Sequence, residues 1–169
     1  SFKTEDSDVE CLTTGREGVG GGIEISADEV ELSGYLRTRS GDNKISESWT
    51  GNAETHNMRI AAKGGDINLN AKRILIDKTS VNRSDPDNWI TTNGMESGLS
   101  TIATSAGDAG DININSDNLS IIGGNFGGQS RSSYPTRAQS AIYSWTKVRP
   151  HGGLKLKAGR GGDISINSK

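Results

Sequence analysis

Apolar and polar residues alternate in four short segments of the chain that share one pattern. The segments are Ile23–Ala27, Ile67–Ala71, Ile112–Ser116 and Ile164–Ser168. In the first three, two further residues are followed by a second apolar pair, at Val30 and Leu32, Ile74 and Ile76, and Leu119 and Ile121. A period of two is typical of β-strands, because successive side chains of a strand point to opposite faces. The pattern therefore predicts strands with one apolar face.

The four segments begin at residues 23, 67, 112 and 164, which gives steps of 44, 45 and 52 residues. A repeat of this length predicts structural units that stack on one another. A third apolar segment follows in each repeat, at Met58–Ile60, Leu99–Ile102 and Ala141–Ile142, with Leu154–Leu156 as a rival in the last repeat. Three short strands joined by tight corners describe one turn of a parallel β-solenoid. An antiparallel sandwich with chance similarity between segments is the alternative.

Stacked turns would place equivalent side chains in columns about 4.8 Å apart. Such a narrow core needs few apolar residues, and Leu, Ile, Val and Phe supply only 32 of the 169. The expected core columns contain Ile23, Ile25, Ile67, Leu69, Ile112, Ile114, Ile164 and Ile166. Outward asparagines are expected to form hydrogen-bonded ladders between turns; they are Asn68, Asn70, Asn113, Asn115 and Asn167.

The repeats Gly65–Ala71, Ser105–Ile121 and Gly159–Ser168 share the pattern Gly-Asp-Ile-x-Ile-x-Ala or Ser, with small variations. This pattern resembles the repeats of filamentous-haemagglutinin-type exoproteins of two-partner secretion. The resemblance implies a right-handed β-helix that is exported by an outer-membrane partner and acts as a bacterial adhesin, secreted or at the cell surface. The Asn-Pro-Asn-Gly motif of the family's secretion domain is absent from the sequence, so the chain resembles the repeat region.

Long insertions interrupt the repeats at about 34–56, 78–97 and 123–153, and we expect them to form loops. The insertions contain Trp49, Trp89, Trp145, Tyr134 and Tyr143. Loops that leave from the same side of a solenoid would align these aromatic rings on one flank, as a surface for a sugar or a protein. Alternatively, each ring pins its own loop to the sheet by burying apolar area.

Glycine and aspartate precede the last three segments, as Gly65, Asp66, Gly110, Asp111, Gly162 and Asp163. Stacked aspartates suggest either a calcium site or caps for backbone N–H groups at a turn. Calcium-binding β-rolls repeat such motifs about every nine residues, which favours the structural role here. One cysteine, Cys11, and two distant histidines, His56 and His151, predict neither a disulfide framework nor a metal site, and no cofactor motif is present.

Charge is distributed unevenly along the chain: residues 1–34 carry a net charge of −7 and residues 122–169 carry +7. In a solenoid, sequence order becomes axial order, so one end is expected to be acidic and the other basic. Val9–Leu12 resembles the last strand of a preceding turn, and Ile164–Ser168 the first strand of a following one. We therefore expect either an excerpt of a longer exoprotein or copies that join head to tail into filaments.

These observations favour a non-catalytic extracellular structural or adhesive module whose partners are glycans or proteins of host or bacterial surfaces. The alternative is a carbohydrate-binding or polysaccharide-degrading β-helix protein, because fold does not determine function. Asp77, Asp85, Asp87 and Glu96 are the carboxylates to test for glycoside hydrolysis. No nucleic-acid recognition motif accompanies the basic end. No apolar run reaches the roughly 18 residues of a membrane span.

Overall fold

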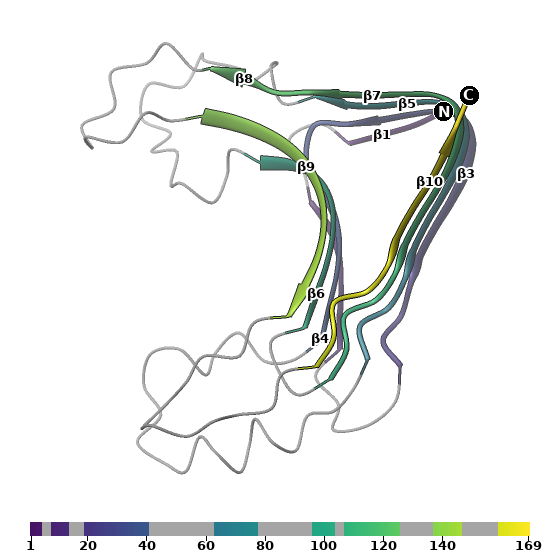
Figure 1. Cartoon of the computed structure of the whole chain (residues 1–169). Helices are drawn as coiled ribbons and strands as arrows, with labels where there is room; N and C mark the ends of the chain where they lie inside the picture. The colour runs from purple at the N-terminus through teal and green to yellow at the C-terminus, as the bar shows by residue number, and fades with distance from the viewer. Residues whose placement is uncertain are drawn as a thin grey trace.

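The computed structural model of the chain describes residues 1–4, 8–13, 19–40, 63–77, 96–103, 107–125, 137–146 and 159–169. Every regular element in these ranges is a β-strand. Two sheets face each other across the core, and the long strands of the first sheet bend sharply at one corner (Figure 1). The structure thus confirms the expected all-β fold of parallel strands.

The first sheet has the strand order β1-β3-β5-β7-β10, and all its neighbours are parallel. Its strands are β1 (Phe2–Thr4), β3 (Ile23–Leu32), β5 (Ile67–Asp77), β7 (Ile112–Ile122) and β10 (Ile164–Ser168). The second sheet has the order β2-β4-β6-β9-β8, and only β8 runs antiparallel to its neighbour. Its strands are β2 (Val9–Thr13), β4 (Tyr35–Ser40), β6 (Glu96–Ala103), β8 (Gly124–Asn125) and β9 (Arg137–Thr146).

Equivalent residues of successive repeats pair side by side, as the sequence pattern predicts. Ile23 lies opposite Ile67, Ile67 opposite Ile112, and Ile112 opposite Ile164. This register is kept although the sequence steps between repeats differ. Each repeat therefore crosses the first sheet, enters the second sheet and returns one strand position further along. Such an arrangement is compatible with a β-solenoid.

Two predictions about the strands need correction. The segments expected as separate strands, such as Ile23–Ala27 and Val30–Leu32, belong to one continuous strand that bends between them (Figure 1). In the first repeat, the segment that pairs with Leu99–Ile102 is part of β4, which lies within the insertion expected to form a loop. Only Ser33 and Gly34 separate β3 from β4, so the chain enters the second sheet directly after leaving the first.

The predicted insertions are shorter than expected because strands occupy part of each. Strand β4 lies within 34–56, β6 begins within 78–97, and β8 and β9 lie within 123–153. In the last repeat, Ala141 and Ile142 are the residues that pair with β6. The rival segment Leu154–Leu156 and the predicted strand Met58–Ile60 lie outside the described residues.

The core lies between the two sheets and consists of columns of aliphatic side chains. The middle of the stack is fully enclosed, with Ile67, Ile74 and Ile112 all 0% exposed. The buried cluster comprises Ile23, Val30, Leu32, Leu36, Ile67, Leu69, Ala71, Ile74, Ile76, Leu99, Ile112 and Ile114. Ile25 is only partly buried, and Ile164 and Ile166, which were expected in the core, are 44% and 49% exposed. They lie on β10, which has a strand neighbour on one side only among the described residues.

Hydroxyl groups complete the inner face of the second sheet where apolar residues would be expected. Thr38 and Thr101 are 0% exposed, yet both hydroxyls donate to backbone carbonyls, of Gly65 and of Gly110. The Thr101 bond measures 2.6 Å. Ser144 continues this column: it donates to the carbonyl of Gly110 at 3.2 Å and accepts from the amide of Gly162 at 2.7 Å. Because buried polar groups must be paired, this column joins the second sheet to the glycine corner of the first.

Glycine is required at that corner because successive repeats approach through their backbones. A Cβ atom added to Gly65 would lie 2.0 Å from the carbonyl oxygen of Gly21, and one on Gly110 would lie 2.0 Å from that of Gly65. At Gly162 the corresponding distance, to the oxygen of Gly110, is 1.9 Å. The glycine pattern of the sequence is therefore explained by contact between layers.

Replacement of Gly65 by alanine should destabilise the protein strongly. The new Cβ would force backbone apart in the middle of the stack, and we expect a loss of about 3 kcal/mol in the free energy of unfolding, the upper end of the usual range for overpacking. Gly21→Ala is the matched control, because among the described residues the nearest atom to its Cβ is Cys11 Sγ at 3.9 Å. Urea unfolding of both variants checks this, and equal losses would contradict the role assigned to the corner.

Candidate functional site

The outer face of the second sheet carries aromatic, arginine and acidic side chains on neighbouring strands. Strand alternation directs Leu36 and Thr38 into the core and therefore Tyr35, Arg37 and Arg39 outward. Strand β9 contributes Tyr143 and Trp145 to the same face. We call Tyr35, Arg37, Arg39, Tyr143 and Trp145 the aromatic–arginine surface. Strands β4, β6 and β9 curve so that this outer face is concave (Figure 1).

Three aromatic rings of this surface contact one another edge to face. The rings of Tyr35 and Tyr143 have centroids 6.2 Å apart at an angle of 84°, and the Tyr143 hydroxyl donates to that of Tyr35 at 3.4 Å. The rings of Tyr143 and Trp145 are 6.3 Å apart at 72°. Tyr35 is 2% exposed, whereas Trp145 is 40% exposed. Tyr35 is therefore the buried member of the cluster, and Trp145 is the exposed one.

Gly98 makes the contact between the two tyrosines possible. It lies between Tyr35 and Ala141 in the sheet register, and it has a φ of +140°, a conformation that L residues rarely adopt. A Cβ at this position would lie 1.8 Å from the carbonyl oxygen of Ala141. Without a side chain on β6 at this point, the ring of Tyr35 reaches across the strand toward Tyr143.

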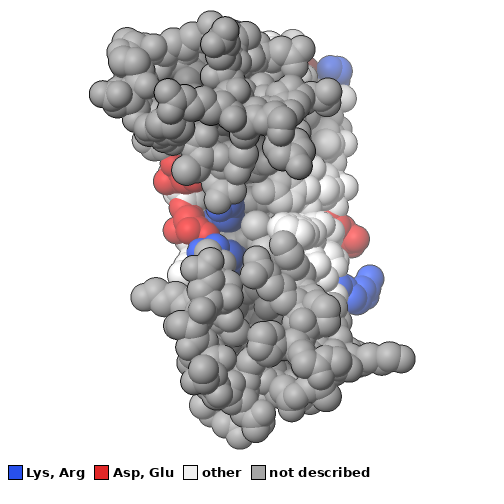
Figure 2. All heavy atoms as spheres, turned by 90° about the vertical axis from the view of Figure 1, so that its left-hand side faces the viewer, with Lys and Arg blue, Asp and Glu red and all other residues white. Residues whose placement is uncertain are grey.

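Arginine and carboxylate groups surround the rings. The guanidinium carbon of Arg37 lies 4.5 Å from the centroid of Tyr35, a cation–π contact, and Arg37 Nε donates to Ser100 Oγ at 3.1 Å. Arg39 Nη2 lies 3.1 Å from Glu10 Oε1, and its buried Nε has no hydrogen-bond partner among the described residues. Figure 2 shows acidic and basic side chains next to each other on this face.

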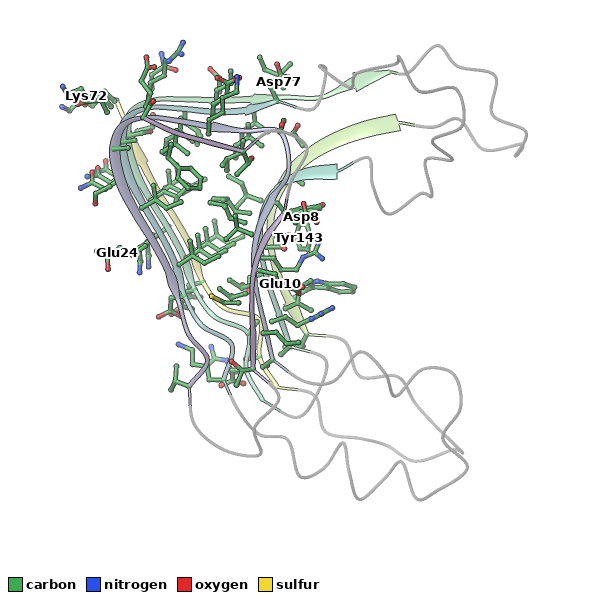
Figure 3. All side chains as sticks on the ribbon, turned by 180° about the vertical axis from the view of Figure 1, so that it is seen from behind. Asp8, Glu10, Glu24, Lys72, Asp77 and Tyr143 are labelled. Atoms are coloured by element: carbon green, nitrogen blue, oxygen red, sulfur yellow. The ribbon has the colours of Figure 1, made fainter. Side chains whose placement is uncertain are left out.

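The acidic residues of this face come from the N-terminal segment. Asp8 Oδ1 accepts a hydrogen bond of 2.8 Å from the amide of Tyr35 and so fixes the start of β4. Figure 3 shows Asp8, Glu10 and Tyr143 on the same outer side of the second sheet, pointing away from the core. The surface thus combines an exposed ring with donors and acceptors held on adjacent strands.

The corner aspartates cap the backbone of the next repeat. Asp66 Oδ1 accepts from the amide of Asp111, and Asp111 Oδ1 from that of Asp163, both at 2.8 Å. Lys63 Nζ lies 3.4 Å from an oxygen of Asp66 and 3.6 Å from one of Asp111. Burial opposes the charge of Lys63, but attraction to Asp66 and Asp111 outweighs it and raises the pKa of Lys63 above its ordinary 10.5.

This raised pKa predicts a dependence of stability on high pH. A group whose folded pKa lies above its unfolded pKa stabilises the fold below the unfolded value, and the contribution is lost as the pH rises through the folded pKa. We expect wild type to exceed Lys63→Met in the free energy of unfolding at about pH 8 and the difference to shrink above about pH 11. Urea unfolding at both pH values measures this difference in the free energy of unfolding. A difference that does not change with pH would contradict the stabilising role of the Lys63 ion pairs.

An asparagine ladder covers the outer side of the first sheet. Asn113 Nδ2 donates to Asn68 Oδ1 at 2.9 Å, and Asn115 and Asn167 continue a second ladder from Asn70, with distances of 3.3 and 3.0 Å. The ladder borders a shallow depression of about 260 Å³. Each ladder bond uses one N–H of the donor amide, and a second N–H remains for another acceptor. The described lining of the depression has no aromatic ring and only one charged side chain, Glu24, so the ladder is a weaker candidate site than the aromatic–arginine surface.

The structure brings together two of the five aromatic residues that the sequence proposed as a ligand surface. Tyr143 and Trp145 lie on β9, not in a loop as expected, while Trp49, Trp89 and Tyr134 lie outside the described residues. Sequence reasoning missed Tyr35, Arg37 and Glu10. The alternation in Tyr35–Ser40 is a signal for the outward direction of Tyr35 and Arg37, but it lies within the insertion 34–56 that the sequence predicts as a loop. Glu10 lies on β2.

The structure describes the backbone of two of the four carboxylates proposed for hydrolysis. Asp77 ends β5 and Glu96 begins β6, whereas Asp85 and Asp87 lie outside the described residues. Among the described residues, no three histidine, cysteine, aspartate or glutamate side chains are grouped to hold a metal ion. Nor does that part of the chain form a helix of the length and hydropathy needed to cross a membrane.

Comparisons with protein-family models, with curated proteins and with solved structures give no match to this chain.

Proposed function

We propose that this chain is a non-catalytic structural and adhesive module. We further propose that its architecture is a right-handed parallel β-helix in which each turn has three faces. The in-register pairing of repeats supports a solenoid, and the bend within the first-sheet strands supports a turn with three faces, two from the bent strand and one from the second sheet. In this proposal the module is secreted or displayed on a bacterial surface, where it binds a glycan or protein. The resemblance of the repeats to exported adhesins supports that location.

The observation that carries the adhesive role is the aromatic–arginine surface. Its side chains come from strands that the stack holds rigidly, so a ligand would meet a preorganised surface and lose little binding energy to ordering. Tyr143 fixes the ring of Trp145 from one side. The corner carboxylates of Asp66 and Asp111, by contrast, are engaged by backbone amides and Lys63, which suits a structural role.

A carbohydrate is the second candidate for what the surface binds, and the exposed indole of Trp145 favours it. Aromatic faces stack on the apolar side of a sugar ring, while nearby charged groups bond its hydroxyls. Glu10 and Arg39 supply an acceptor and donors on the same outer face, and strand β6, with Ile102 opposite both Arg39 and Trp145, separates them from the indole. Binding without bond cleavage would make the chain a carbohydrate-binding module.

We expect Trp145→Ala to weaken binding to the recognised glycan or cell surface by about tenfold, or roughly 1.4 kcal/mol, because an aromatic contact of this kind is lost. Trp145→Phe should retain part of the affinity. Glycan arrays and binding to intact bacterial and host cells identify the ligand, and titration calorimetry measures the change.

Asn113→Ala is the matched control, since Asn113 is exposed on the outer side of the first sheet. It should bind like wild type. Equal binding by wild type and Trp145→Ala on every surface would overturn the role of the aromatic–arginine surface. Release of reducing sugar from a bound polysaccharide would instead favour the degrading enzyme.

A further inference from the structure

Arg37 has a fixed position on the outer face of the second sheet. It lies on β4, which has a parallel strand on each side, β2 and β6. Its guanidinium carbon is 4.5 Å from the centroid of the Tyr35 ring, and its Nε donates to Ser100 Oγ at 3.1 Å. Tyr35 and Ser100 are 2% and 0% exposed, so packing fixes both partners. Two buried groups therefore hold the head group of Arg37 in place.

Both of these contacts are with uncharged groups. Arginine has five N–H donors, and the bond to Ser100 uses one of them. Within the described part of the chain, no carboxylate forms an ion pair with Arg37. The positive charge and the two Nη groups of Arg37 are therefore left for a partner that the described residues do not supply.

Arg39 keeps the neighbouring carboxylate away from Arg37. Glu10 of β2 lies opposite Arg37 in the sheet register. Its Oε1 nevertheless lies 3.1 Å from Nη2 of Arg39, which is the next outward residue of β4. The side chain of Arg39 is 12% exposed, so salt screens this ion pair less than it would screen an exposed pair. The pair neutralises Glu10 and leaves the charge of Arg37 uncompensated.

A carboxylate is the group that this arrangement fits. A guanidinium is a planar fork whose N–H groups bind both oxygens of a carboxylate at once. Because Ser100 occupies Nε, the end of the fork with Nη1 and Nη2 is the edge that remains for a ligand. Hydrogen bonds between two charged groups are about twice as strong as those between neutral groups. Arg37 therefore favours an anionic ligand over a neutral one.

An aromatic ring lies beside this position. Tyr143 is opposite Ser100 in the sheet register, and its ring centroid is 6.2 Å from that of Tyr35. The guanidinium of Arg37 and the ring of Tyr143 thus contact the same tyrosine. Tyr143 points away from the core (Figure 3). A sugar ring with a carboxylate attached directly to it would meet both the charge of Arg37 and the ring of Tyr143.

We propose that the aromatic–arginine surface binds a sugar that bears a carboxylate, a uronic or a sialic acid, and that Arg37 binds this carboxylate. The proposal rests on the adhesive function proposed above and names the ligand class within it. An extended acidic peptide fits less well, because peptides gain main-chain hydrogen bonds at a sheet edge, and β4 is already paired on both sides. A nucleic acid needs several phosphate contacts, whereas Arg37 contacts one anionic group.

Binding of matched sugars by wild type and by Arg37→Gln tests the proposal. The probes are sialyllactose with lactose and an oligogalacturonide with its methyl ester, and titration calorimetry measures their affinities. We expect wild type to bind a carboxylated probe at least about tenfold more tightly than its neutral counterpart, which lacks the charge-assisted bonds. Arg37→Gln should bind both members of that pair equally. Arg37→Lys should have an intermediate preference, because lysine keeps the charge but not the fork.

Arg73→Gln is the matched control, because it removes the same charge from the first sheet. Arg73 is exposed there, and its Nε lies 3.3 Å from Glu29. This variant should keep the preference of wild type. Arg39→Gln should weaken the preference, because Glu10 is then released to pair with Arg37, and the added change Glu10→Gln should restore it. The unfolding midpoint of each variant checks that the fold is intact.

The proposal is overturned if wild type shows no preference for a carboxylated probe, or if Arg37→Gln keeps the preference. Tighter binding of sulfated lactose or of a polyglutamate peptide than of either carboxylated sugar would also overturn it. Equal binding of neutral sugars by wild type and Arg37→Gln contradicts this proposal alone and leaves the adhesive function standing. Wild type that binds no glycan and no cell surface contradicts both.

Discussion

The close approach of successive backbones at the glycine corner is the constraint on which the structure depends. A Cβ at Gly65 or Gly110 would lie 2.0 Å from the carbonyl of the preceding layer, so these positions admit no side chain. This contact holds successive repeats in one register, and like residues then lie on like residues. The aliphatic columns, the asparagine ladder and the aspartate caps all follow from that register.

The first sheet could be predicted from sequence because its inward residues are aliphatic and alternate with polar ones. Strand β4 could not, because of its three inward residues only Leu36 is apolar, while Thr38 and Ser40 are buried as well. The hydroxyl of Thr38 is satisfied by the carbonyl of Gly65, which belongs to the next repeat. A local hydrophobic pattern does not reveal a partner that the fold alone brings near, and the segment therefore resembled a loop.

The candidate site was predictable only in part for a related reason. Tyr143 and Trp145 attract notice in a chain with few aromatic residues, but their neighbours Tyr35 and Arg37 lie more than a hundred residues earlier in the sequence. The strand order β4-β6-β9 brings them together, and Gly98 leaves the intervening space open. The surface is thus a product of register, since no short motif encodes it.

The register of β10 on β7 matches that of β7 on β5, although the sequence step is 52 residues in one case and 45 in the other. Additional chain length between strands therefore leaves the scaffold unaltered, and the entropy of closing a longer connection rises only slowly with its length. Connecting segments are consequently free to diverge or to be exchanged while the stacked backbone stays constant. Evolution can therefore change the surface chemistry of the protein through its connecting segments, while the strand stack keeps its structure.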